Sequence, residues 1–69
     1  MSEIEETLSR YQFAIRLRRL ADAVESGNPF TIGVGSKSVR VPPSAVRAIV
    51  HEREGEENEL EFQLSWKQR

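Results

Sequence analysis

The first clear pattern in the chain is a run of apolar residues at helical spacing. From Ser9 to Gly27 these residues recur every three or four positions, which places them on one side of an α-helix. They are Phe13, Ala14, Leu17, Leu20, Ala21 and Val24. Ser9 followed by Gln12 is a capping-box signature for a helix start, and Gly27 followed by Asn28 and Pro29 is typical of a helix end. We therefore predict one amphipathic helix between Ser9 and Gly27.

After Pro29 the apolar residues alternate with period two, which indicates strands. Residues 30–34 and 38–41 both show this alternation. Placing Val34 opposite Val39 joins the two strands through a four-residue loop, a usual hairpin length. Pro42 and Pro43 cannot donate hydrogen bonds to a neighbouring strand, so we expect the chain to leave the sheet there.

Two further alternating segments follow the prolines and form a second predicted hairpin. Facing Arg53 with Glu59 and His51 with Glu61 adds opposite charges across the strands and leaves residues 54–58 as the loop. In this register the apolar residues of both strands share the inner face. That inner set is Val46, Ala48 and Val50 from one strand and Leu60, Phe62, Leu64 and Trp66 from the other. We expect Trp66 to be buried beneath the helix.

The predicted elements define an α+β fold. Alternation in residues 3–8 predicts a short N-terminal edge strand ahead of the helix. The expected order is β-α-β-β-β-β, with the helix packed on one face of an antiparallel four-stranded meander. The 69 residues have room for one core, so we expect a single domain over 1–69.

Composition narrows the function classes. Hydrophobic residues make up 38% and charged residues 30%, a balance typical of a soluble globular protein. No apolar run approaches the length of a membrane span or a signal peptide, so we expect a cytoplasmic protein. With no cysteine and one histidine, disulfide scaffolds, thiol enzymes and cysteine zinc sites are excluded. We expect no metal and no cofactor.

The net charge of −1 hides a segregation of charge along the chain. Residues 1–9 and 54–69 each carry a net charge of −3, whereas residues 10–53 carry +5. The acidic ends can pair with the basic middle, which is the interpretation we favour because exposed charges are mostly solvated. The alternative is a basic binding face.

Three segments of the chain resemble one known family. They are Thr7–Arg10, the string from Ala14 to Gly27, and the alternating glutamate and apolar run from Glu59 to Trp66. Together they resemble the amphi-Trp domain family, small prokaryotic proteins named for a C-terminal tryptophan. The resemblance implies the fold but no mechanism, since the family has no assigned activity. Tyr11, Gln12 and Phe13 depart from the acidic and alanine residues expected there, as do the arginines of the outward strand faces.

Two features suggest chemistry but have simpler explanations. His51 is predicted to point outward beside Arg47 and Arg53, with Glu61 able to orient it across the hairpin. General-base catalysis would also need a nucleophile, an oxyanion stabiliser and a pocket, and no motif indicates them. Gly33 and the next glycine lie within a hairpin and not before a helix, so they are turn glycines and not a phosphate loop. We expect no enzyme.

The best functional lead is the sheet face that the helix leaves uncovered. Its candidate binding residues are Arg40, Arg47, Ile49, His51 and Arg53. We expect a non-enzymatic interaction module that uses this face to bind a protein partner or a second copy as a homodimer. The alternative is weak, sequence-tolerant nucleic-acid binding through Arg40, Arg47, Arg53 and Lys37, although His51 is the one outward aromatic predicted on this face for base stacking. Neither a membrane nor a small-molecule substrate is implied.

Overall fold

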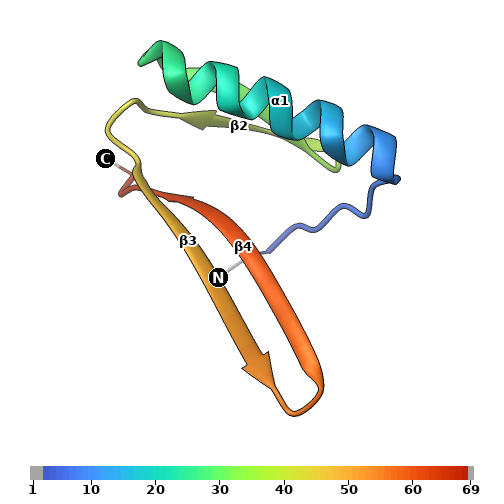
Figure 1. The fold of residues 1–69 in the computed structure, drawn as a ribbon. Coiled ribbons are helices and arrows are strands. Elements are labelled where there is room, and N and C mark those ends of the chain that lie inside the picture. Colours follow the sequence, from blue (N-terminus) through green and yellow to red (C-terminus); the bar gives the residue numbers. More distant parts are fainter. Residues whose placement is uncertain (1–2, 69) are drawn as a thin grey trace.

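The computed structural model describes residues 3–68 and contains one helix and four strands (Figure 1). In chain order they are α1 (Arg10–Ser26), β1 (Phe30–Val34), β2 (Lys37–Val41), β3 (Val46–Glu54) and β4 (Glu57–Ser65). The α+β class predicted from the sequence is confirmed. Within the described residues, α1 is too short and too polar to cross a membrane.

The ends of α1 follow the predicted capping residues. The Gln12 amide donates to Ser9 Oγ and the Ser9 amide donates to Gln12 Oε1, both at 3.2 Å, so the capping box is complete. At the other end Gly27 has φ +75° and its amide donates to the Val24 carbonyl at 3.2 Å. Glycine adopts this left-handed conformation without steric cost, and the helix stops there.

The two predicted antiparallel hairpins are confirmed, but they form two separate two-stranded sheets, so the prediction of one four-stranded meander is wrong. β1 pairs with β2 and β3 pairs with β4, both antiparallel. Between β2 and β3 the Ala45 amide donates to the Pro42 carbonyl at 3.1 Å, which closes a turn. After this turn β3 runs away from β2, so the second hairpin, β3 and β4, diverges from α1 and the first hairpin (Figure 1).

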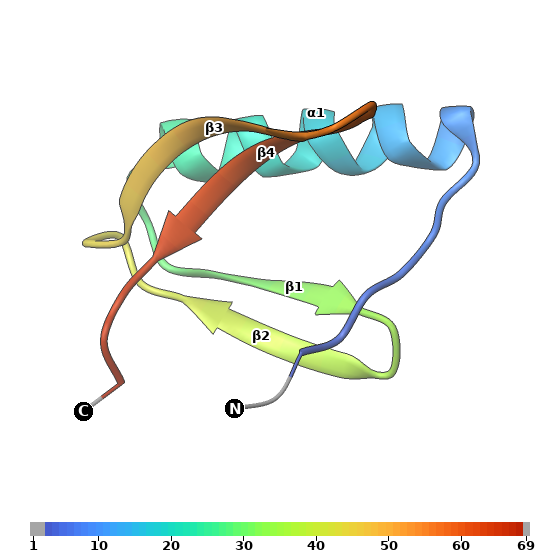
Figure 2. The same ribbon diagram turned by 90° about the horizontal axis from the view of Figure 1, so that it is seen from below.

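Residues 3–9 form no strand, so the predicted N-terminal edge strand is also wrong. Instead Glu6 Oε1 accepts from the Gly35 amide at 3.0 Å and from Arg16 Nη2 at 3.1 Å. Arg16 Nη1 also donates to the Gly33 carbonyl at 2.6 Å. The segment therefore crosses from the start of α1 to the turn of the first hairpin (Figure 2), held by side chains and not by a strand ladder.

The first hairpin has a tighter turn than the spacing predicts. Val34 pairs with Lys37, so the loop is the two residues Gly35 and Ser36 and the predicted pairing of Val34 with Val39 is wrong. Gly35 has φ +58°, the conformation that a two-residue hairpin turn needs at its first position. Because the pairing moves by an even number of residues, every side chain keeps the face predicted for it.

The second hairpin also has a two-residue turn, but here the turn changes which side chains share a face. Gly55 has φ +61° and Ile49 pairs with Phe62, whereas the predicted register paired Val50 with Phe62. A one-residue shift turns the strands' apolar sets to opposite faces. We call the two sides the front face and the back face. The front face carries Arg47, Ile49, His51, Arg53, Asn58, Leu60, Phe62 and Leu64, and the back face carries Val46, Ala48, Val50, Glu52, Glu54, Glu57, Glu59, Glu61, Gln63 and Ser65.

The core is small. Within residues 3–68 only Val41 and Ala45 are buried hydrophobic residues, with 2% and 3% of their surface exposed. Both lie at the junction where the first hairpin passes to β3. Neither α1 nor the second hairpin contributes a fully buried side chain.

Candidate functional site

An apolar groove lies between α1 and the front face of the second hairpin. Its volume is about 590 Å³. The helix wall is Leu17, Leu20, Ala21 and Val24, which belong to the apolar stripe that the helical spacing predicts. The hairpin wall includes Arg47, Ile49, Phe62 and Leu64. The stripe thus faces a groove where a compact domain would have a second packed layer.

The apolar side chains around this groove are largely open to solvent. Ile49 and its cross-strand partner Phe62 are 68% and 62% exposed, and Leu60 on the same face is 68% exposed. On the helix, Phe13 is 56% exposed and Leu17 is 39% exposed. An exposed apolar set of this size, carried on facing elements, is typical of a binding surface.

Four of the five candidate residues from the sequence share the front face, and the fifth does not. Arg47, Ile49, His51 and Arg53 alternate along β3 and are exposed, as expected. Arg40 lies on β2 in the other sheet, opposite Thr31, so no continuous sheet joins it to the rest. The predicted face is therefore open, but only the part on β3 forms one surface.

Sequence reasoning missed Leu60 and Phe62, which it placed in the core. They lie on the front face opposite His51 and Ile49. The prediction that basic and apolar residues lie on opposite faces of the second hairpin is therefore wrong. Gly55 is the signal in the sequence that could have placed them correctly. A two-residue turn of Gly55 and Glu56 pairs Glu54 with Glu57, and this pairing fixes the register without any argument from charge pairs.

The polar groups of the front face are held by local hydrogen bonds. His51 Nε2 lies 2.9 Å from Asn58 Oδ1, whereas Glu61 is on the back face, so the predicted His51–Glu61 pairing is wrong. Arg47 Nη1 donates to the Ala45 carbonyl at 3.2 Å, and Arg53 Nε donates to the Gly55 carbonyl at 3.1 Å. Among residues 3–68 neither arginine forms an ion pair, so both guanidinium groups lie beside the apolar residues with carbonyl partners alone.

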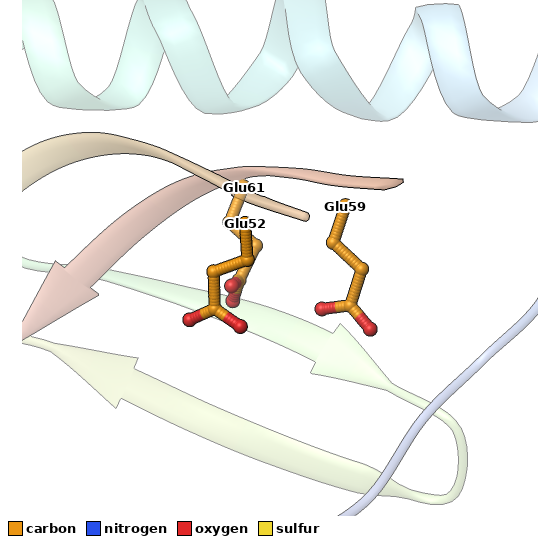
Figure 3. A group of neighbouring side chains, drawn as sticks. All are labelled: Glu52, Glu59 and Glu61. Carbon is orange, nitrogen blue, oxygen red and sulfur yellow. The ribbon is translucent and has the colours of Figure 1, made fainter. Parts of the chain in front are cut away.

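The back face is acidic. Carboxylate oxygens of Glu52, Glu59 and Glu61 lie within 4.8 Å of one another, and Glu52 is directly opposite Glu59. Figure 3 shows these side chains pointing away from α1. Carboxylate oxygens are the ligands that Mg²⁺ and Ca²⁺ take, so within residues 3–68 these three residues form the group that could attract a cation. Their direct effect on the hairpin is repulsion between like charges.

The comparison with known families decides the membership of this chain. A family model described as the Amphi-Trp domain matches residues 1–69, the whole chain. The chain belongs to the Amphi-Trp domain family. A search of curated proteins and a search of solved structures found no match. The family membership expected from the helix string and the C-terminal run is thus confirmed.

The tryptophan of this Amphi-Trp domain does not lie beneath the helix. β4 ends at Ser65, and Trp66 is half-buried beyond it. It lines a shallow depression together with Arg40, Pro42 and Pro43, and it does not line the groove of α1. The prediction of a buried indole under α1 is therefore wrong. Its cause is the same assumption of one continuous sheet that misplaced the meander.

Proposed function

We propose that this Amphi-Trp domain is a non-enzymatic interaction module that binds a protein surface through the front face and the adjoining groove. The observation that carries the proposal is the set of three large apolar side chains on one hairpin face. Ile49, Leu60 and Phe62 are each more than 60% exposed and lie next to one another across β3 and β4. We also propose a cytoplasmic location, as expected from the composition.

Burial of this face is favourable on simple physical grounds. Covering a large apolar side chain contributes roughly 1.5–3 kcal/mol, and an isolated two-stranded hairpin is at best marginally stable in water. A partner would therefore stabilise the second hairpin as it binds. Arg47 and Arg53 border the apolar residues, and arginine is enriched in protein interfaces where it surrounds or anchors an apolar centre.

The surroundings of the groove support binding and not catalysis. The lining is mainly aliphatic and aromatic, and its charged members are Arg47 and Glu25. The one histidine of the chain, His51, has Asn58 as its partner. General acid–base or nucleophilic chemistry needs several polar groups that converge on one point, and the proposed role requires none.

Weak nucleic-acid binding is the second candidate, and one observation favours it. Phe62 lies on the face that carries Arg47 and His51, which gives that face an exposed aromatic on which a base can stack. Charge argues against it. From Val46 to Trp66 there are six glutamates and two arginines, a net charge of −4, and the acidic back face lies only one strand layer away from the front. Phosphates would be repelled, so a protein surface is the better match.

Site-specific photo-crosslinking in the source cells tests the proposal. A photoreactive phenylalanine analogue is placed at Phe62 on the front face or, as a matched control, at Val46 on the back face, which is 65% exposed. We expect discrete protein adducts from position 62 and few from position 46. Equal labelling at both positions, or none at position 62, would contradict the proposal.

A second measurement separates the two candidates. Fluorescence anisotropy with short labelled DNA and RNA at low salt should show no binding if the partner is a protein. Binding that falls steeply with added salt and is lost in Arg47→Glu would instead support nucleic-acid recognition.

A further inference from the structure

We infer that the surface which covers the groove is a second copy of the same chain, in a two-fold symmetric dimer. The front face of each hairpin lies on the apolar stripe of the other copy's α1. This inference rests on the proposed function, because it names the partner of the same face. Four observations carry it: the exposed area, the extended shape, the lengths of the two elements and their charges.

The exposed area matches what one further copy can cover. The chain exposes 6535 Å², whereas a compact monomer of this mass exposes about 4,400 Å². Each copy therefore carries an excess of about 2,100 Å², part of it on the extended chain ends. Two copies carry about 4,200 Å², which lies within the range of roughly 2,000–5,000 Å² buried in obligate homodimers.

The shape of the chain gives the same result. Its radius of gyration is 13.3 Å, and a compact chain of 69 residues has about 11 Å. The excess comes from the second hairpin, which diverges from α1 toward its turn (Figure 1). On α1 the groove is lined by residues between Leu17 and Glu25, and nearer the start of α1 the side chain of Phe13 is 56% exposed.

The two elements that would meet have compatible lengths. α1 has 17 residues and so is about 25 Å long, and the nine-residue strands of the second hairpin are about 30 Å long. A hairpin from a second copy can therefore follow most of the apolar stripe. In a two-fold arrangement each contact occurs twice, so Phe62 of each copy packs near Leu17 of the other.

The charges of the front face disfavour hairpin on hairpin. The front face carries Arg47 and Arg53 and no carboxylate, because the glutamates of the second hairpin lie on its back face or in its turn. Two front faces in direct contact would bring these arginines together, whereas the helix wall of the groove includes Glu25. Contact of the front face with α1 therefore avoids that repulsion.

Sedimentation equilibrium of the full chain over a wide concentration range tests the inference. We expect a mass of twice 7.9 kDa that falls to the single-chain mass on dilution. Ile49→Arg places a charge in the centre of the contact, and Val46→Arg is its matched control because the two aliphatic side chains have similar exposure on opposite faces of β3. Ile49→Arg should weaken association about thirtyfold or more, the loss expected at an interface hot spot, and Val46→Arg should change it little.

A crosslinking measurement covers the case in which Ile49→Arg fails to fold. The chain has no native cysteine, so each engineered cysteine is unique. A Leu17→Cys chain oxidised together with a Phe62→Cys chain should form the mixed disulfide in high yield. The same Leu17→Cys chain oxidised with Val46→Cys should not, because position 46 is on the back face.

The possible results separate the inference from the proposed function. A chain that stays monomeric at every concentration overturns the dimer, as does equal disulfide yield at positions 62 and 46. Photo-crosslinks from position 62 to a different protein, with a monomer in sedimentation, leave the proposed function standing and refute self-association. A dimer that resists Ile49→Arg and dissociates with Val46→Arg places the contact on the back face and also refutes the inference.

Discussion

The two hairpins of this chain have the same local design and different surroundings. Each is antiparallel and closed by a two-residue turn that begins with glycine. In β1 half-buried and exposed residues alternate at every step, and β2 ends at the buried Val41. In β3 only Val50 of nine residues is even half-buried. The first hairpin runs along α1 (Figure 2), whereas the second diverges from α1 toward its turn (Figure 1).

The contrast shows what apolar alternation does and does not specify. Alternation tells which residues share a strand face, but not which layer covers that face. The single helix has one apolar stripe, and its side toward β1 already meets Phe30 and Ile32 across a shallow depression with Leu20 and Ala23. One helix cannot cover two hairpins, so the front face of the second hairpin stays exposed.

The largest expected effect is the loss of stability in Val41→Asp, which tests whether the buried core lies in the first hairpin and not in the second. Val41→Asp places an unpaired carboxylate at a site with 2% exposure and should destabilise the protein by about 3–5 kcal/mol. Val46→Asp makes the same change at 65% exposure and should stay within about 0.5 kcal/mol. Urea unfolding followed by circular dichroism, at one protein concentration, measures both. Similar losses at the two valines would mean that β3 is buried as deeply as β2.

The next effect compares the two turns. Gly35→Ala and Gly55→Ala each force a left-handed alanine, at φ +58° and φ +61°, which should cost about 1–2 kcal/mol. Gly35→Ala should cost more, because its new methyl group would lie 3.2 Å from Ile4 Cγ2, whereas the one at Gly55 meets nothing within 4 Å. Thermal unfolding of the two variants checks the order. A larger loss at Gly55 would show that the N-terminal segment does not rest on the first turn.

The smallest expected effect is the change in stability caused by Glu59→Lys, whose sign depends on the register of the second hairpin. Glu59 faces Glu52, so Glu59→Lys should replace repulsion by attraction and stabilise the hairpin by about 0.2–1 kcal/mol. In a register shifted by one residue Glu59 would face Arg53, and the same substitution would destabilise it. Amide hydrogen exchange of β3 and β4 reports the change. Glu56→Lys, which alters the same charge within the turn, is the control.

Local features of the fold could be predicted from the sequence, and features that depend on one turn residue could not. Ser9, Gln12 and Gly27 set both ends of α1 through contacts within a few residues, so the pattern was sufficient. The hairpin registers depend on whether Gly35 and Gly55 open two-residue turns. An argument from cross-strand charges, each worth only about 0.2–1 kcal/mol, cannot outweigh that turn geometry.

The exposure of part of the candidate site was predicted correctly, but the reason given for it was wrong. Arg47, Ile49 and His51 were expected on an open face, and they are exposed. They are open because no second layer covers the hairpin, not because the apolar residues face the other way. Phe62 and Trp66 were misplaced for the same reason, since both assignments assumed that one continuous sheet passes beneath α1.

The carboxylates on the back face have one more consequence. A hairpin with apolar side chains on both faces could stack on further copies without limit and form a fibre. Here the back face of the second hairpin carries five glutamates, so a second hairpin stacked on it would be repelled by their negative charge. Like charges disfavour stacking in that direction, so a dimer closed through the front face, as inferred above, would not extend into a fibre.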